Sequence, residues 1–185
     1  MRVITGKARG IRLKTPDGML TRPTADKVKE AVFSVLQFDI PGSRVLDLFA
    51  GTGQLGIEAI SRGAVSAVFV DGRRDACKLV QENLRLTKFS AQAQVVQSDY
   101  LAYLERCRDK FDLIFLDPPY AEVFLENALM KISEIDILSD RGIIICERPA
   151  EKTLDFEIAG LSSGKDYRNG KTWVTLFRKR DLTEE

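Results

Sequence analysis

The chain has 185 residues, of which 44% are hydrophobic, so it is long enough to bury one substantial core and too short for two full-sized domains. No apolar run approaches the roughly 20 residues that cross a bilayer, and we expect a soluble, cytoplasmic protein. Histidine is absent, which excludes the commonest general base and the commonest zinc ligand. We therefore expect no metal site, and any chemistry must use carboxylates and a bound cofactor. The three cysteines lack metal-ligand spacing and are expected to be reduced core thiols: Cys77, Cys107 and Cys146.

The net charge of +1 conceals an uneven distribution of charged residues. Residues 1–30 hold eight Lys or Arg against three Asp or Glu, and residues 164–180 hold six against one. Two basic ends that meet in space would favour a polyanionic partner. Chance clustering of solvated charges explains the pattern equally well, so charge alone does not decide.

The first part of the chain predicts a basic hairpin followed by a docking helix. Residues 3–14 fit two short strands around a turn at residues 7–10. Thr24 is in the position of an N-cap, and the apolar residues after it recur at helical spacing: Val28, Ala31, Val32, Val35 and Leu36. We expect this amphipathic helix to pack on the sheet that follows.

From residue 44 onward, short apolar runs alternate with helical stretches, which is typical of an open α/β sheet with parallel strands. Strands are predicted at residues 45–49, 67–70, 93–96, 111–116 and 143–146, with weaker ones near 156–158 and 172–177. Helices are predicted at residues 55–62, 74–87, 100–107 and 123–135. Seven strands with helices on both faces form one domain, since no linker separates independent units.

A glycine-rich turn follows the first of these strands. Gly51 and Gly53 would let the backbone approach a ligand, and Gly56 would let the next helix pack close to the strand. The same spacing occurs in dinucleotide-binding proteins, and glycines that merely permit a tight turn would also explain it. Asp71 ends the second strand, where it can accept hydrogen bonds from ribose hydroxyls, and Asp99 follows the third, where it can accept from an adenine amine. Either aspartate alone also fits surface charge, but together with the turn they predict an adenosine site.

The sequence Asp117-Pro118-Pro119-Tyr120 follows the apolar strand at 111–116 and so lies at the same edge of the predicted sheet. An exocyclic base amine is a poor nucleophile because its lone pair is delocalised into the ring. The Asp117 carboxylate and the Pro118 carbonyl can both accept amine hydrogens, which favours a pyramidal nitrogen with an available lone pair. The prolines hold these acceptors rigidly, and Tyr120 offers a face on which an extruded base can stack. A strand that merely ends at proline is the simpler alternative.

The tetrapeptide resembles the motif of amino-methyltransferases that act on DNA and RNA bases. Residues 21–33, residues 47–59 and Gly170-Lys171-Thr172 are similar to the bacterial small-subunit ribosomal RNA guanine-N2 methyltransferase family, over nearly the whole chain. This resemblance implies a Rossmann-like class I methyltransferase with a seven-stranded, mostly parallel sheet, a short N-terminal hairpin, and S-adenosylmethionine as cofactor. It also implies ribosomal RNA or the assembling small ribosomal subunit as partner. We place the hairpin and docking helix at residues 1–38 and the methyltransferase domain at 39–185, as parts of one domain.

The resemblance assigns roles to individual residues. Catalytic roles fall on Asp117, Pro118, Pro119 and Tyr120. Cofactor contacts fall on Asp47, Phe49, Gly51, Gly53, Asp71, Gly72, Asp99 and Tyr100. For the RNA backbone we propose the basic residues Arg9, Arg12, Lys14 and Arg22, although Arg22 could instead fix the helix that follows it. At the end of the second strand the family usually carries Glu, whereas this chain has the shorter Asp71 followed by Gly72.

Three alternatives share some of these features. A dinucleotide-dependent dehydrogenase would use the glycine turn but would leave the Asp117 tetrapeptide without a role. An amino-methyltransferase acting on adenine or cytosine in DNA, or on another RNA or protein amide, would use the same tetrapeptide. A non-enzymatic RNA-binding module would use only the basic ends, and the intact Asp71, Asp99 and Asp117 argue against it.

Overall fold

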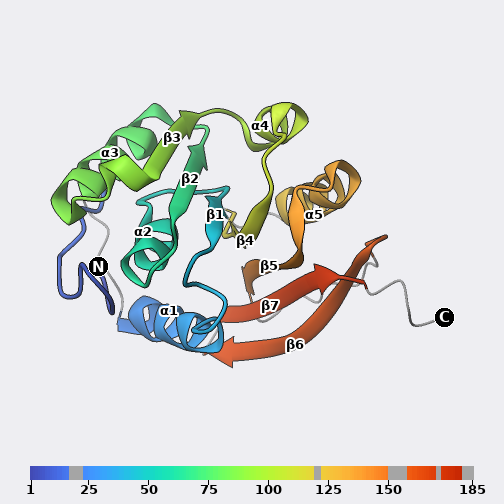
Figure 1. The fold of residues 1–185 in the computed structure, drawn as a ribbon, viewed down its shortest axis with the longest axis horizontal. Coiled ribbons are helices and arrows are strands. Elements are labelled where there is room, and N and C mark those ends of the chain that lie inside the picture. Colours follow the sequence, from blue (N-terminus) through green and yellow to red (C-terminus); the bar gives the residue numbers. More distant parts are fainter. Residues whose placement is uncertain (17–22, 119–121, 150–157, 170–171, 181–185) are drawn as a thin grey trace.

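A computed structural model describes residues 1–16, 23–118, 122–149, 158–169 and 172–180 (Figure 1). Its strands form a seven-stranded sheet in the order β3-β2-β1-β4-β5-β7-β6. The parallel strands are β1 (Arg44–Asp47), β2 (Ser66–Asp71), β3 (Ala93–Gln97), β4 (Phe111–Leu116) and β5 (Leu138–Pro149). The last two strands, β6 (Leu161–Asn169) and β7 (Thr172–Lys179), pair antiparallel, and β7 also runs antiparallel to β5.

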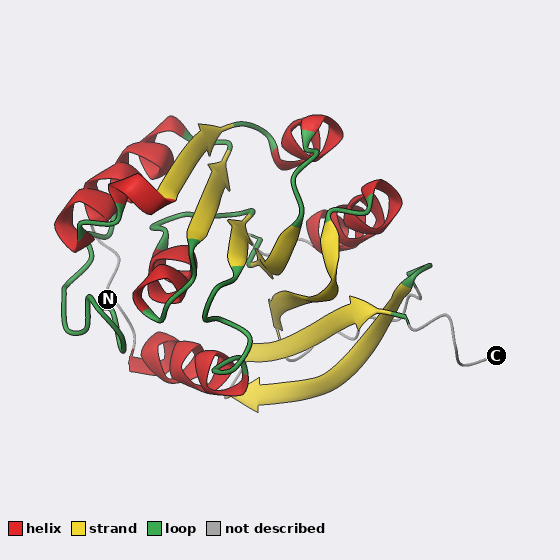
Figure 2. Cartoon of the chain, viewed as in Figure 1, coloured by secondary structure: helices red, strands yellow, loops and turns green. Residues whose placement is uncertain are grey.

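Helices cover both faces of this sheet (Figure 2). One face is packed by α1 (Pro23–Val35), α2 (Gln54–Ser61) and α3 (Arg74–Thr87), and the other by α4 (Tyr100–Arg106) and α5 (Glu122–Ile135). Strand side chains alternate between the two cores. On β4, Leu113 and Phe115 enter the core of α1 to α3, whereas Ile114 and Leu116 enter the core of α4 and α5. The predicted α/β architecture with parallel strands is confirmed.

The N-terminal segment is a short hairpin that is also held by α2. An antiparallel bridge joins Arg2 to Arg12, and the N–H groups of Val3 and Leu13 donate to the carbonyls of Ile11 and Met1, so the two predicted arms pair but form no regular strands. Other backbone donors of the segment bond to α2. The N–H groups of Ile4 and Thr5 donate to the Glu58 carboxylate at 2.8 and 3.0 Å, and that of Ala8 donates to Ser61 Oγ at 3.0 Å. Backbone groups bonded to helix side chains are not available for pairing with a second strand.

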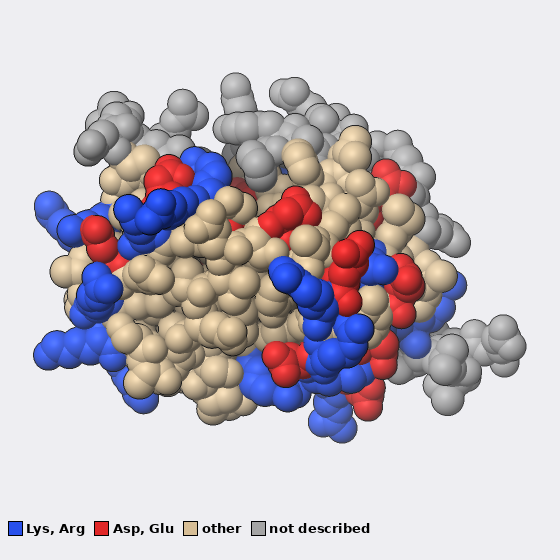
Figure 3. Space-filling view, turned by 90° about the horizontal axis from the view of Figure 1, so that it is seen from above, with Lys and Arg blue, Asp and Glu red and all other residues tan. Residues whose placement is uncertain are grey.

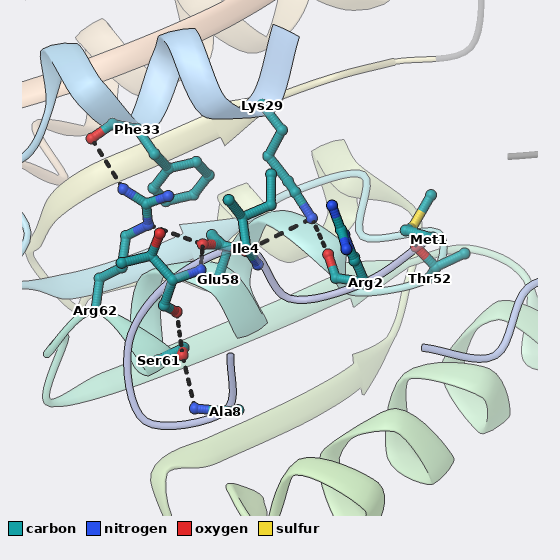
Figure 4. Close-up of polar contacts among 12 residues, drawn as sticks. Met1, Arg2, Ile4, Ala8, Lys29, Phe33, Thr52, Glu58, Ser61 and Arg62 are labelled. Carbon is teal, nitrogen blue, oxygen red and sulfur yellow. Dashed lines mark hydrogen bonds and ion pairs between the residues drawn. The ribbon is translucent and has the colours of Figure 1, made fainter. Parts of the chain in front are cut away.

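Glu58 is the centre of this attachment (Figure 4). Its side chain is fully buried, and a buried carboxylate is costly unless it is paired and hydrogen-bonded. Arg62 Nε lies 2.8 Å from Oε1, and Lys29 Nζ from α1 lies 3.5 Å from Oε2. Lys29 also donates to the carbonyl of Arg2 at 2.7 Å. The docking helix, α2 and the N-terminal segment therefore form one packed unit.

Two predicted boundaries need correction. The docking helix begins at Pro23, so Thr24 lies in its first turn and is not the N-cap; proline at the first helical position needs no N–H partner. The sixth strand is Leu161–Asn169, not residues 156–158. Residues 156 and 157 lie outside the described ranges, and Ile158 is not in a strand. The polar composition of residues 162–166 suits an edge strand and gave little apolar signal.

Candidate active site

The carboxyl ends of the parallel strands meet along one edge of the twisted sheet, and those of β2 and β3 lie at the top of Figure 1. Acidic residues stand at or just after the ends of four parallel strands, and a fifth lies in β5 just past its pairing with β4: Asp47, Asp71, Asp99, Asp117 and Glu147. Ligands of open α/β sheets bind at this edge. The sequence predicted four of these five residues as site residues and missed Glu147.

The glycine turn lies between β1 and α2, as predicted. Gly51 and Gly53 have φ values of 54° and 76°, a left-handed conformation that favours glycine, and Gly53 is the cap of α2. Among the described residues, the nearest atom to a Cβ at Gly51 would be the Phe49 carbonyl oxygen at 4.0 Å, so they leave the space above the turn open. A Cβ at Gly56 would lie 2.3 Å from the ring of Phe69 on β2. Gly56 is therefore needed for the close contact of helix and strand.

Asp71 joins the end of β2 to this turn. Its Oδ2 accepts a hydrogen bond from Gly51 N at 2.9 Å, and its Oδ1 accepts from Arg73 N at 2.9 Å. Each carboxylate oxygen can accept more than one hydrogen bond, so acceptor capacity remains for a ligand hydroxyl. Gly72 is adjacent, and a Cβ there would lie 3.8 Å from the nearest atom, the Ser98 carbonyl oxygen. Asp71 and Gly72 thus lie beside the open space above the turn.

Asp99 has a structural role that the sequence analysis did not identify. It is the N-cap of α4, and its Oδ1 accepts from Leu101 N at 2.9 Å and Ala102 N at 3.2 Å. No described residue donates to its other oxygen, Oδ2, which therefore keeps the capacity to accept from a ligand. Capping and ligand binding are compatible, since they use different oxygens.

Three aromatic rings form a cluster next to Asp99 in which each ring is near the other two. Phe49, after β1, lies 5.1 Å from Tyr100 and 6.5 Å from Phe124 between ring centroids, and Tyr100 lies 5.6 Å from Phe124. Phe49 and Tyr100 were predicted from the resemblance, whereas Phe124 on α5 was not. Phe124 is 38% exposed, which is a large fraction for an apolar side chain that packs against other rings. The cluster offers an apolar surface between the ends of β1 and β4.

Asp47 lies beneath the glycine turn. Its carboxyl group is buried and accepts a hydrogen bond from Gly56 N at 3.0 Å. The pKa of Asp47 is raised to about 7, mainly by burial; the Gly56 hydrogen bond opposes this shift, and the nearby Asp117 and Asp71 carboxylates add to it. Its described partner is the backbone of α2, so Asp47 holds helix and strand together.

Asp117 and Glu147 form a half-buried carboxyl pair on neighbouring strands. Leu116 on β4 is opposite Cys146 on β5, so the residues that follow them are level with each other. Burial raises the pKa of Asp117 to about 6, and burial together with the negative charge of Asp117 raises the pKa of Glu147 to about 8. No described residue donates a hydrogen bond to either carboxyl group. In their ionised forms, two such acids at one strand edge are suited to accepting hydrogens from a ligand.

The remaining predicted residues are placed as follows. Pro118 is half-buried directly after Asp117, while Pro119, Tyr120 and Arg22 lie outside the described residues. Arg9 and Arg12 are exposed on the N-terminal segment. Lys14 is exposed too, but its Nζ lies 2.9 Å from Glu82 on α3. The face in Figure 3 carries separate groups of Lys and Arg with Asp and Glu among them, so the described residues form no uniform basic surface there.

Membrane-spanning helices and metal-binding groups are both absent from the described residues. Within the described ranges, no helix is long and apolar enough to span a bilayer. The same ranges contain no group of three acidic or cysteine side chains arranged to hold a metal ion.

The strand order, the antiparallel final pair, the glycine turn and the acidic strand ends define a Rossmann-like class I methyltransferase. The solved structure of yhhF from Escherichia coli superposes with a TM-score of 0.88 at 29% identity, covering 98% of this chain and 99% of that one. The chain belongs to the family described as Conserved hypothetical protein 95, which matches residues 1–178.

Two relatives show how far the likeness extends. YlbH of Bacillus subtilis is 40% identical, over 97% of this chain and 100% of its own length. Ribosomal RNA small subunit methyltransferase D of Escherichia coli is 31% identical, over 97% of this chain and 90% of its own length. The family resemblance inferred from the sequence motifs is confirmed.

Proposed function

We propose that this chain transfers a methyl group from S-adenosylmethionine to the exocyclic N2 amine of a guanine in small-subunit ribosomal RNA. The observation that carries the proposal is the half-buried Asp117 at the end of β4, across the sheet edge from the open glycine turn. The name of the Escherichia coli relative supports the class of RNA, since it acts as a small-subunit ribosomal RNA methyltransferase. The choice of guanine N2 rests on the motif resemblance and on the chemistry below.

The described residues fit an adenosine-containing cofactor. The space above Gly51 is open, and the Asp71 carboxylate is oriented beside it by two backbone N–H groups. An orientated carboxylate at the end of the second strand is suited to ribose hydroxyls. The free Oδ2 of Asp99 is suited to an adenine amine, and the rings of Phe49 and Tyr100 provide an apolar wall. Gly53 and Gly72 keep the backbone near the ligand free of side chains.

When bound, S-adenosylmethionine supplies an electrophilic methyl group on a sulfonium sulfur. The residues at the end of β4 prepare the amine that receives it. Asp117 accepts one amine hydrogen, and the carbonyl of Pro118 accepts the other, which localises the nitrogen lone pair. As the nitrogen gains a bond to carbon it becomes positively charged, and the adjacent carboxylate stabilises that charge. The surplus proton then passes to Asp117 or to water.

The polymer would be recognised through its phosphates and through the extruded base. Arg9 and Arg12 project from a segment that Glu58 and Ser61 hold firmly to α2, so they form a rigid contact for an RNA backbone. We place the protein with ribosomal RNA or the assembling small subunit in the cytoplasm. The exposed Phe124 would flank the base, and the motif resemblance assigns the stacking role to Tyr120.

Methyl-acceptor assays test the proposal directly. The purified protein is incubated with labelled S-adenosylmethionine and, separately, with ribosomal RNA, small ribosomal subunits and DNA, and the products are digested for mass spectrometry. We expect N2-methylguanosine from small-subunit RNA or subunits, and no label in DNA. Label in methyladenine or methylcytosine of DNA would replace this function with the alternative amino-methyltransferase.

A further inference from the structure

Glu147 is the acidic residue of the sheet edge to which the sequence motif assigns no role. It follows Cys146 on β5 and is level with Asp117, which follows Leu116 on β4. Neighbouring strands lie about 4.8 Å apart, so the two carboxyl groups can contact one small planar ligand. Alternation along the strands places both side chains on the sheet face of α1 to α3, since Ile145 and Phe115 belong to that core. Glu147 is therefore positioned beside the proposed acceptor amine.

Among the described residues, no hydrogen bond or ion pair explains why position 147 carries a carboxyl group. The next residue, Arg148, belongs to the opposite face of the sheet, where its guanidinium pairs with Asp166 at 2.9 Å, donates to Thr175 and stacks on Trp173. No described residue donates a hydrogen bond to Glu147 or forms an ion pair with it. A half-buried acid without such a partner is destabilising, unless a ligand supplies the missing donor.

We propose that Glu147 accepts the N1–H of the target guanine while Asp117 accepts a hydrogen of its N2 amine, so that the pair selects guanine. This inference rests on the proposed function, because it names the specificity-determining residue of the same site. The supporting chemistry is the donor pattern of the bases. On its Watson–Crick edge guanine presents N1–H and the N2 amine side by side, which are donors only.

Adenine and cytosine present a different edge to the same pair. Each places an exocyclic amine next to an unprotonated ring nitrogen, which is an acceptor. An ionised carboxylate is acceptor-only, so Glu147 would face a lone pair and lose its hydrogen bond. Sites built to bond a particular hydrogen reject analogues that lack it strongly, because the buried polar group is left unpaired. Asp117 by itself cannot make this distinction, since all three bases carry an amine.

Because the pKa of Glu147 is raised to about 8, the carboxyl must lose its proton before it can accept N1–H, so the preference for guanine belongs to its ionised form. Burial and the adjacent Asp117 disfavour its charged form in the free protein. A donor such as N1–H offsets that penalty only when the base is present. The bound base thus supplies the hydrogen-bond donors that the described residues do not provide to Asp117 and Glu147.

The analogue 2-aminopurine separates recognition from catalysis. It carries the same C2 amine as guanine, but its N1 has no hydrogen. The acceptor nucleotide is first located by mass spectrometry on RNA or small subunits methylated by the native protein. Substrates are then assembled with guanine or 2-aminopurine at that position, and kcat/KM is measured for each at about pH 9, where Glu147 is ionised.

The native protein should prefer guanine over 2-aminopurine by about 100-fold or more, as expected for a lost buried hydrogen bond with an opposed lone pair. Glu147→Gln should narrow that ratio by roughly tenfold or more, because the amide can donate to the bare N1. Cofactor affinity should be unchanged. The matched control is Asp140→Asn, which alters an exposed acid of the same strand and should leave the ratio as it is.

Glu147→Asp provides the second variant, in case the glutamine substitution fails to fold. Aspartate keeps an acceptor-only group on a shorter chain, so turnover should fall while the preference for guanine persists. An unchanged ratio in Glu147→Gln, or a lost preference in Glu147→Asp, would overturn the role of Glu147. Native protein that yields no N2-methylguanosine would instead overturn the proposed function, and with it this inference.

Discussion

The two halves of the sheet edge use the same kind of side chain in opposite ways. At the β2 and β3 side, the carboxylates of Asp71 and Asp99 each accept two backbone hydrogen bonds. At the β4 and β5 side, Asp117 and Glu147 are half-buried, and no described residue donates to them. Backbone donors fix a carboxylate in place as a charged acceptor, whereas burial without donors favours its protonation. Under the proposed function, the first half orients the ribose and adenine of the cofactor, and the second accepts hydrogens from the base.

The largest expected effect is on the second half. Asp117→Ala should slow methyl transfer by about 100-fold to 10,000-fold, the range for loss of a positioned acid or base. Cofactor affinity should stay within a few fold, because Asp117 acts on the amine and not on the ribose or adenine. Single-turnover rates and calorimetry measure the two quantities. Near-normal turnover would mean that the residues after β4 only end a strand.

A substitution in the first half should instead weaken cofactor binding and leave the rate of methyl transfer nearly unchanged. Asp71→Ala removes a carboxylate bonded to Gly51 and Arg73, and should weaken cofactor binding by about 1 to 3 kcal/mol, the cost of leaving buried polar groups unpaired. The rate at saturating cofactor should change little. Asp75→Ala, an exposed acid in the first turn of α3, is the matched control and should bind normally. If Asp71→Ala binds as the parent does, the cofactor lies elsewhere.

The pH dependence of the free energy of unfolding tests the difference between the two halves of the edge, and it needs no substrate. Folding raises the pKa of Glu147 from its ordinary 4.5 to about 8. Between these values the folded protein holds more protons than the unfolded chain, so this residue lowers the free energy of unfolding as pH rises through the interval. Glu147→Gln should therefore be more stable than the parent at pH 8, by roughly 1 to 3 kcal/mol, and about equal to it near pH 4.

Urea unfolding at the two pH values measures this difference. Asp140→Asn, on the same strand but with a side chain that is 97% exposed, should show no such pH dependence. A Glu147→Gln protein that is less stable than the parent at pH 8 would mean that the carboxylate has a stabilising partner.

The sequence predicted the sheet and most of this edge because each of those features has a local signal. Alternating apolar runs indicated the parallel strands, and the helix at residues 74–87 coincides with α3. The glycines were recognisable because their spacing follows a buried strand, and the structure gives Gly51 and Gly53 the left-handed conformation that requires them. Asp117 stood out through the prolines beside it. These are properties of a few consecutive residues.

What the sequence did not predict depends on contacts between distant residues. Glu147 is an acidic residue after an apolar run, a weak signal that gains meaning only when β5 pairs with β4. The short pairing of the N-terminal arms depends partly on Glu58 and Ser61, more than 50 positions away, which accept from three backbone donors of the segment. The cap role of Asp99 was hidden because strand end and helix start coincide there. Phe124 joins its cluster only through the packing of α4 against α5.

The smallest expected effect lies outside both halves of the edge, on the N-terminal segment. Replacing Arg9 and Arg12 together with Ala should weaken RNA binding at low salt and flatten the slope of log affinity against log salt by about 1.4 to 1.8, since each phosphate contact contributes roughly 0.7 to 0.9. Lys14→Ala should change the slope less, because its ammonium is already paired with Glu82. Cofactor affinity and the stability of the fold should not change, since both arginines are exposed and the segment is held by backbone bonds to Glu58 and Ser61. Filter-binding isotherms at several salt concentrations measure the slope. If the double variant overlays the parent at every concentration, the phosphates are bound elsewhere, and the basic residues around β6 and β7 become the next to test.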